Sequence, residues 1–324
     1  MKFLVIGDLH LGKTYFPFLK FTKNPYFDSP TSKSFANIWT DNLIQYIRST
    51  VYNILSGFKK ESVTVVFLGD VLDNVRIPEK IVKELLKIKL LDFILDTHSN
   101  CTISIVIGNH DKNIKRQKKQ SSILHKFQNY RNRVVVYEET TLISSKIVGD
   151  ILYFPYILKK EFIHNLSKFK NMIYGEPIIF SHNNMYVNDC FGSAYTFQKK
   201  DVNTILNISN CVLFNGHFHR HFYEDGFFLT GSVAPTSMKD DFQSRGICFY
   251  DSVSKKIEIF KNNSMVFMSI ANENHLEKLF EMLQYAKEAN CKVALQITQD
   301  VRKYVKNICK IFPETVVATS FHGE

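Results

Sequence analysis

The segment FLVIGDLH, residues 3–10, decides how the rest of this chain is interpreted, because an apolar run ends at a glycine and is followed by a carboxylate and an imidazole. Short apolar runs bounded by glycine are typical of buried strands. Loops gather the polar residues that follow such strands at one edge of a sheet. We therefore expect one site built from five segments, because polar residues also follow apolar runs at Gly69-Asp70, Gly108-Asn109-His110-Asp111, Ser181-His182 and Gly216-His217-Phe218-His219.

The pattern between these motifs predicts a mixed α/β fold. Helices are expected at 36–58 and 78–98, and strands are expected just before each motif. Later strands follow one another closely, which predicts a second sheet packed on the first, at 147–154, 224–230, 247–250 and 257–260. After residue 262 the order strand, helix, strand, helix, strand predicts a small appended domain, at 265–270, 275–289, 292–297, 301–311 and 315–319. The expected domains are residues 1–262 and 263–324.

The predicted helix at 78–98 is apolar over more than one face. Packing into the core explains a wide apolar stripe, and so does burial in the interface of a homodimer. The sequence leaves both interpretations open.

Composition restricts the class of protein. The chain has 324 residues with 45% hydrophobic content, which is typical of a packed globular protein, and a formal net charge of +10, which favours a polyanionic partner. No run approaches the roughly 18 apolar residues of a membrane span. The first motif begins so early that we expect no signal peptide. Six cysteines without a CxxC pair indicate reduced core residues and a cytoplasmic location.

The residue types of the motifs predict two metal ions. Asp8 and His10 are two residues apart, as are His217 and His219, so in extended backbone each pair lies on one side. Asp70 is the candidate carboxylate bridge between cations roughly 3.5 to 4 Å apart. An amide oxygen and a further imidazole come from Asn109 and His182.

Such a centre should attract phosphate. Two divalent ions, two carboxylates and a bridging hydroxide leave a net positive charge, whereas a cage made only of carboxylates would repel an anion. Oxygen and nitrogen donors without thiolate suit manganese, iron or zinc, and we expect manganese.

His110 follows Asn109 directly and is not needed as a metal ligand. It is the candidate catalytic group, which would stabilise the phosphorane-like transition state or protonate the departing oxygen. Asp111 either orients His110 or bonds to its own backbone as a turn residue.

The motif set resembles the calcineurin-like metallophosphoesterase superfamily. Within it, the stretches DLHLGK (8–13), GDVLD (69–73) and GHFHR (216–220) are similar to SbcD-type DNA repair nuclease subunits of bacteria and phages, in particular the recombination exonuclease subunits of T5-like phages. The resemblance covers residues 1–260. It implies a four-layer α/β/β/α sandwich with a small C-terminal α/β capping domain, and the host cytoplasm as the location if the protein is phage-encoded.

The resemblance also implies roles. One metal would be held by Asp8, His10, Asp70 and His219, and the other by Asp70, Asn109, His182 and His217, with His110 catalytic. It implies manganese-dependent exonuclease and endonuclease action on DNA ends beside an SbcC-type ATPase, and a homodimer. Asp73 departs from the pattern, since many cellular relatives have histidine there, and the usual ATPase-anchoring tail is short or absent.

Basic residues near the motifs are candidate DNA contacts. The run 112–119 follows the His110 motif, and a charge run is either a solvated face or a phosphate-binding surface. Tyr15 and Phe16 either contact a nucleotide or pack under the first loop. The candidate phosphate contacts are Lys13, Lys115, Arg116, Lys118 and Lys119.

Two other functions compete with a DNA nuclease. A phosphatase or small phosphodiesterase would fit the same fold, but protein phosphatases have Asp-Arg-Gly after the second motif, where this chain has Asp73-Asn74-Val75. A non-catalytic scaffold that had lost its metals would not need a complete set of metal ligands, so the complete set in this sequence argues against it.

Overall fold

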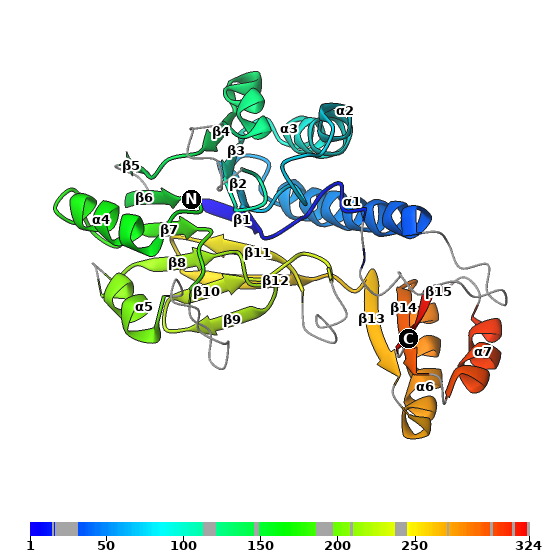
Figure 1. Cartoon of the computed structure of the whole chain (residues 1–324). Coiled ribbons are helices and arrows are strands. Elements are labelled where there is room, and N and C mark those ends of the chain that lie inside the picture. The colour runs from blue at the N-terminus through cyan, green and yellow to red at the C-terminus, as the bar shows by residue number, and fades with distance from the viewer. Residues whose placement is uncertain are drawn as a thin grey trace. The chain divides into compact units, whose positions relative to one another are not determined.

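The computed structural model describes residues 1–14, 16, 32–112, 121–145, 149–185, 197–207, 210–236, 245–270, 272–298, 301–312 and 315–322. It divides into two compact units (Figure 1). The first unit comprises residues 1–12, 48–233 and 246–260, and the second comprises residues 13–47, 234–245 and 261–324.

The first unit contains two six-stranded mixed sheets. In the first sheet β1, β2, β3 and β4 run parallel, and β11 pairs antiparallel with β1. Their order is β12-β11-β1-β2-β3-β4, with bounds Lys256–Lys261, Gly246–Asp251, Lys2–Ile6, Val63–Leu68, Cys101–Val106 and Val134–Tyr137. In the second sheet the order is β5-β6-β7-β8-β10-β9, with bounds Thr141–Ser145, Gly149–Phe154, Ile178–Ser181, Val212–Asn215, Phe227–Thr230 and His221–Glu224.

Helices flank the two sheets (Figure 1). A cluster of buried side chains from both sheets fills the space between them, and it includes Phe3, Val66, Phe180 and Phe214. This is the expected α/β/β/α sandwich. The helices are α1 (Ser32–Ser56), α2 (Glu79–Val82), α3 (Phe93–Thr97), α4 (Lys159–Lys170) and α5 (Lys199–Leu206), with a π-helical segment at Lys83–Asp92 and 3₁₀ turns at Ile123–Phe127 and Tyr130–Asn132.

The sequence-based assignment of strands to sheets was wrong in part. The strands expected at 247–250 and 257–260 exist, but they belong to the first sheet, where Phe249 pairs with Leu4. Strands β7 and β8, which carry two of the motifs, lie in the second sheet instead. The reason is physical, because the spacing of strands along a chain does not encode which open sheet edge a returning strand will pair with.

The predicted helix at 78–98 is observed as α2, the π-helical segment and α3. Most of its apolar residues are buried, among them Leu86, Leu90 and Leu91, which supports core packing. Ile88 is 54% exposed, so part of the apolar stripe faces outward.

The second unit contains a three-stranded parallel sheet of β13 (Met265–Ile270), β14 (Lys292–Thr298) and β15 (Val316–His322). Helices α6 (Leu276–Glu288) and α7 (Arg302–Ile311) connect the strands, as the sequence predicts. Leu283, Leu295 and Val305 belong to its core. This unit also includes residues 13–47 and 234–245, and the division at residue 262 remains a prediction.

In the described part of the chain, no helix has both the length and the apolar character needed to cross a membrane. The described cysteines, at 101, 211, 248, 291 and 309, are all buried free thiols. Burial raises the pKa of the Cys211 thiol to about 12, which keeps it protonated and unreactive.

Candidate metal centre

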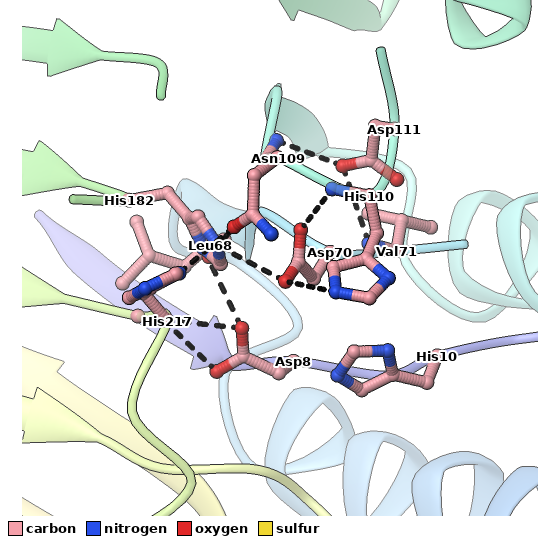
Figure 2. A network of polar contacts seen from close by, with 12 residues as sticks. Asp8, His10, Leu68, Asp70, Val71, Asn109, His110, Asp111, His182 and His217 are labelled. Atoms are coloured by element: carbon pink, nitrogen blue, oxygen red, sulfur yellow. Dashed lines mark hydrogen bonds and ion pairs between the residues drawn. The ribbon is translucent and has the colours of Figure 1, made fainter. Parts of the chain in front are cut away.

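The candidate centre lies where the loops after β1, β2 and β3 meet the loops after β7 and β8 (Figure 2). Backbone hydrogen bonds join these loops. The N–H groups of Leu9 and His10 donate to the carbonyl of Asp70 at 3.0 and 2.9 Å, and Gly216 N–H donates to the Ser181 carbonyl at 2.9 Å. Motifs that are distant in sequence are therefore tied together through their main chains.

Three of the predicted ligands have strained backbones. His10, Asp70 and His217 adopt left-handed conformations, with φ of +50°, +45° and +77°. Each such residue costs about 1 to 3 kcal/mol and persists only where the surroundings impose it. Strain of this kind concentrates at functional sites, and here the left-handed backbone of these residues sets the direction of the candidate ligand side chains.

Two motif glycines are required by close approach. A Cβ at Gly69 would lie 2.1 Å from His182 Nδ1, and a Cβ at Gly108 would lie 2.2 Å from the backbone nitrogen and Oδ1 of Asp70. Neither position has room for any side chain, so the glycines permit the ligands to assemble.

On one side of Asp70, three motifs converge (Figure 2). His182 Nε2 lies 3.3 Å from Asp70 Oδ2 and 3.2 Å from Asn109 Oδ1. His217 Nδ1 lies 2.8 Å from the same Asn109 oxygen. The side chains of Asp70, His182 and His217 offer ligand atoms within 4.8 Å of one another.

On the other side of Asp70 lie His10 and His110 (Figure 2). His110 Nε2 is 4.0 Å from Asp70 Oδ2, and His10 Nε2 is 3.1 Å from His219 Nε2. His10, Asp70 and His110 also offer ligand atoms within 4.8 Å of one another. Asp70 is shared by both groups, as a bridging carboxylate would be, although the bridge itself stays a prediction.

Asp8 lies at the base of the centre and is buried. Its carboxylate accepts hydrogen bonds from the His217 N–H at 3.1 and 3.2 Å, and its Oδ1 is 3.5 Å from His182 Nδ1. His182 Nδ1 lies 2.7 Å from the Leu68 carbonyl. A carbonyl only accepts, so Nδ1 carries a proton and Nε2 is the nitrogen that faces Asp70.

The electrostatics of the centre reflect crowded opposite charges. Burial alone would lower the pKa of His182, but Asp70 and Asp8 outweigh it and raise that pKa to about 10. Burial alone would raise the pKa of Asp70, but His182 holds it below its usual range. Burial, reinforced by the charge of His182, lowers the pKa of His217 to about 3. A proton on His182 therefore provides positive charge that a cation would otherwise supply.

The donor set fits divalent cations. Two imidazole nitrogens, on His10 and His219, face each other at 3.1 Å, and one amide oxygen, on Asn109, contacts two more. Both His/Asp groups could hold an ion, and the donors are nitrogen and oxygen without thiolate. The individual ligand assignments remain predictions, for Asp8, His10, Asp70, Asn109, His182, His217 and His219.

His110 lies beside the centre with 42% of its side chain exposed, as a group that meets substrate should. Asp111 does not serve as its orienting group. Its buried carboxylate accepts backbone hydrogen bonds from Gly108 in its own turn and from Leu72 in the loop after β2, both at 2.8 Å. The ring of His110 is held instead through Nδ1, which lies 2.5 Å from the carbonyl of Asp73.

Two residues that the sequence did not single out as functional also line the centre. Asp73 contacts His110 through its carbonyl, and its carboxylate Oδ1 is 3.5 Å from His10 Nδ1. The ring of Tyr156, just after β6, is 5.6 Å from that of His217. β6 ends without a histidine or a carboxylate, so the sequence contained no signal for Tyr156.

The candidate DNA contacts are described only in part. Lys13 is half-buried, with its ammonium 5.5 Å from the Phe16 ring centroid. Phe16 is fully buried against Phe35 and Trp39 of α1, so its ring is not free to stack on a nucleotide. The other candidates lie outside the described residues, namely Tyr15, Lys115, Arg116, Lys118 and Lys119.

Comparisons with known proteins place the chain in a family. Among solved structures it is similar to the 5'-nucleotidase precursor from Thermus thermophilus, with 9% identity and a TM-score of 0.34 over 89% of this chain. It covers 59% of that structure's chain. No curated protein matches the sequence. The sequence model of the calcineurin-like phosphoesterases matches residues 1–221, which is more than half of the chain, and this protein therefore belongs to that family of metal-dependent phosphoester hydrolases.

Proposed function

We propose that this protein is a two-metal-dependent DNA nuclease of the SbcD type, a phosphodiesterase with exonuclease and endonuclease action that processes DNA ends in recombination and repair. The observation that carries the proposal is the position of Asp70 between two groups of His and Asp donors, with the exposed His110 in one of them. The family typically binds two divalent metals. The DNA substrate is supported by the net charge of +10.

When bound, two divalent cations would neutralise phosphoryl oxygens and lower the pKa of a water molecule. The residues of this chain supply the rest. Asp70 offers oxygens to both sides, while backbone contacts hold its loop in place. His110 directs Nε2 toward the centre, because its Nδ1 is engaged by the Asp73 carbonyl. A protonated Nε2 can hold a phosphoryl oxygen and release its proton to the departing alkoxide.

The proposal includes partners and conditions. Manganese is the proposed metal, an SbcC-type ATPase is the proposed partner, and a homodimer in the cytoplasm is the proposed assembly. A phage origin of the T5-like type would place it in the host cytoplasm. Lys13 and the basic residues of the run 112–119 would bind phosphates of the DNA backbone.

A cleavage assay on linear duplex DNA with Mn²⁺ tests the function. We expect cleavage by the wild type and a loss of about 10² to 10⁴ in rate for His110→Gln, the usual contribution of a general acid. His125→Gln is the matched control, because His125 is 57% exposed and pairs with Glu138 outside the centre. Asp8→Ala should abolish activity together with metal binding.

The same assay separates the competing functions. Hydrolysis of a nucleotide or an aryl phosphate without DNA cleavage would support a phosphatase or small phosphodiesterase. A wild type that binds no Mn²⁺ in calorimetry would support a scaffold. Either result would overturn the nuclease proposal.

A further inference from the structure

Asp73 is not one of the predicted metal ligands, but it lies beside His10, His110 and the loop that carries His10. It follows the Gly69-Asp70 motif by three residues, and its side chain is 18% exposed. Its N–H donates to the Leu11 carbonyl at 3.0 Å, which ties it to the loop that carries His10. The backbone of Asp73 is therefore held in place by this main-chain hydrogen bond, independently of its side chain.

The first contact of interest is with His10. The ring of His10 is buried, and its Nε2 faces His219 Nε2 at 3.1 Å, which leaves Nδ1 on the far side of the ring. In the described part of the chain Nδ1 has no hydrogen-bond partner by strict geometry, and Asp73 Oδ1 lies 3.5 Å from it. A metal on Nε2 would leave the proton on Nδ1, and a small approach of the carboxylate would then form a charged hydrogen bond.

The second contact is with His110. The Asp73 carbonyl lies 2.5 Å from His110 Nδ1, so it accepts the proton of that nitrogen. The rings of His10 and His110 stand edge to face, with centroids 4.9 Å apart and planes at 88° (Figure 2). Asp73 therefore lies beside both neighbouring rings, with its carboxylate 3.5 Å from His10 and its backbone carbonyl hydrogen-bonded to His110.

We infer that Asp73 is a positioning residue that orients His10 toward a metal through its carboxylate and fixes the tautomer of His110 through its carbonyl. The inference rests on the proposed metal centre, but not on DNA as the substrate. A carboxylate that accepts from a metal-bound imidazole orients the ring and makes it a better ligand, and its removal weakens metal binding by about 10- to 100-fold. Because the carbonyl belongs to the backbone, side-chain substitutions remove the carboxylate contact and leave the contact with His110 in place.

Mn²⁺ titration of the full chain, by calorimetry and by the paramagnetic resonance of free Mn²⁺, tests the carboxylate. Asp73→Ala should weaken one of two Mn²⁺ sites by about 10- to 100-fold and leave the other within about twofold. Asp73→Asn keeps an oxygen acceptor and should recover part of the loss. Asp96→Ala is the matched control, because Asp96 is a 65% exposed carboxylate of the same unit that pairs with Arg131.

Histidine ¹⁵N spectra of the Zn²⁺-loaded protein give a readout that does not depend on activity. His10 should show a protonated Nδ1 in the wild type and a weaker hydrogen bond at this nitrogen in Asp73→Ala, while the His110 signals remain unchanged. Equal affinities for both sites in Asp73→Ala and wild type, at equal melting temperatures without metal, would overturn the inference. If the wild type does not cleave DNA but Asp73→Ala shows the site-selective loss of Mn²⁺ affinity, only the nuclease proposal would be overturned.

Discussion

Single residues control this centre at distances of a few ångströms. Asp70 accepts the His110 N–H at 2.8 Å through Oδ1, and its Oδ2 lies 3.3 Å from His182 Nε2. Its backbone is left-handed, and its own backbone nitrogen and Oδ1 leave no room for a side chain at Gly108. At this scale small changes in shape or protonation should have large effects, because the donors already touch one another.

Gly108→Ala should disable metal binding. The new Cβ would lie 2.2 Å from Asp70 Oδ1, so either the carboxylate or the loop must move, and the overpacking should cost about 1 to 3 kcal/mol of stability. Gly57→Ala, where the nearest atom is the Ile54 carbonyl at 3.3 Å, is the control. Calorimetric Mn²⁺ binding and thermal unfolding measure both effects. Unchanged Mn²⁺ affinity in Gly108→Ala would contradict the close approach.

Metal binding should release a proton from His182. Asp70 and Asp8 raise the pKa of this buried histidine to about 10, so without metal the ring is charged at pH 7. A metal ligand must be neutral, and apparent Mn²⁺ affinity should therefore rise with pH, by up to about tenfold per unit, until the pKa is reached. His217, whose pKa is lowered to about 3, is already neutral and should release none.

Calorimetry in buffers of different ionisation enthalpy counts the released protons. We expect at least one proton at pH 7 for the wild type, from His182, and a second where a metal-bound water ionises to hydroxide. A value near zero would show that His182 is neutral before the metal binds.

Whole elements bring these residues together. Strands β1, β2 and β3 end beside one another in the first sheet, and β7 and β8 do so in the second, so five motifs reach one place. The sheets are joined in the core by Tyr137 and Tyr153, whose rings stack with centroids 3.8 Å apart. On the outer face of the second sheet, α4 and α5 are linked by an ion pair between Lys159 and Asp201.

Asp201→Ala should destabilise the α4–α5 layer. The carboxylate pairs with Lys159 and also accepts the N–H of Gln198 at 2.7 Å, at the start of α5. Removing both interactions should cost about 1 to 2 kcal/mol. The control is Glu224→Ala, which removes the more exposed pair between Lys199 and Glu224 and should cost at most about 0.5 kcal/mol. Urea unfolding compares them, and equal losses of stability would contradict the additional capping role.

The whole molecule combines a candidate metal centre with an excess of positive charge. The net charge of +10 is a property of the full chain and acts over distances set by ionic strength. It cannot select a DNA sequence, but it favours a polyanion over a small neutral substrate. Its contribution should therefore be visible in the salt dependence of binding.

Neutralising the basic run should flatten that salt dependence. Replacing Lys115, Arg116, Lys118 and Lys119 by alanine should reduce the slope of log affinity against log salt by up to about 0.9 for each phosphate that the run neutralises. A charge-matched control replaces four exposed lysines elsewhere, Lys59, Lys60, Lys80 and Lys83. Fluorescence anisotropy with duplex DNA at several salt concentrations measures both. Equal slopes for the two variants would show that the run has no special role.

The sequence by itself determined the elements and the candidate donors, because both are local. Apolar runs that end at glycine predicted β1, β2 and β3, and the order strand, helix, strand, helix, strand predicted the elements after residue 262. Only the tertiary structure decided that β11 returns to pair with β1, and that Asp73 and Tyr156 lie beside the predicted ligands. Strand pairing and contacts between loops depend on how distant segments meet in space, and no local pattern of residues encodes that meeting.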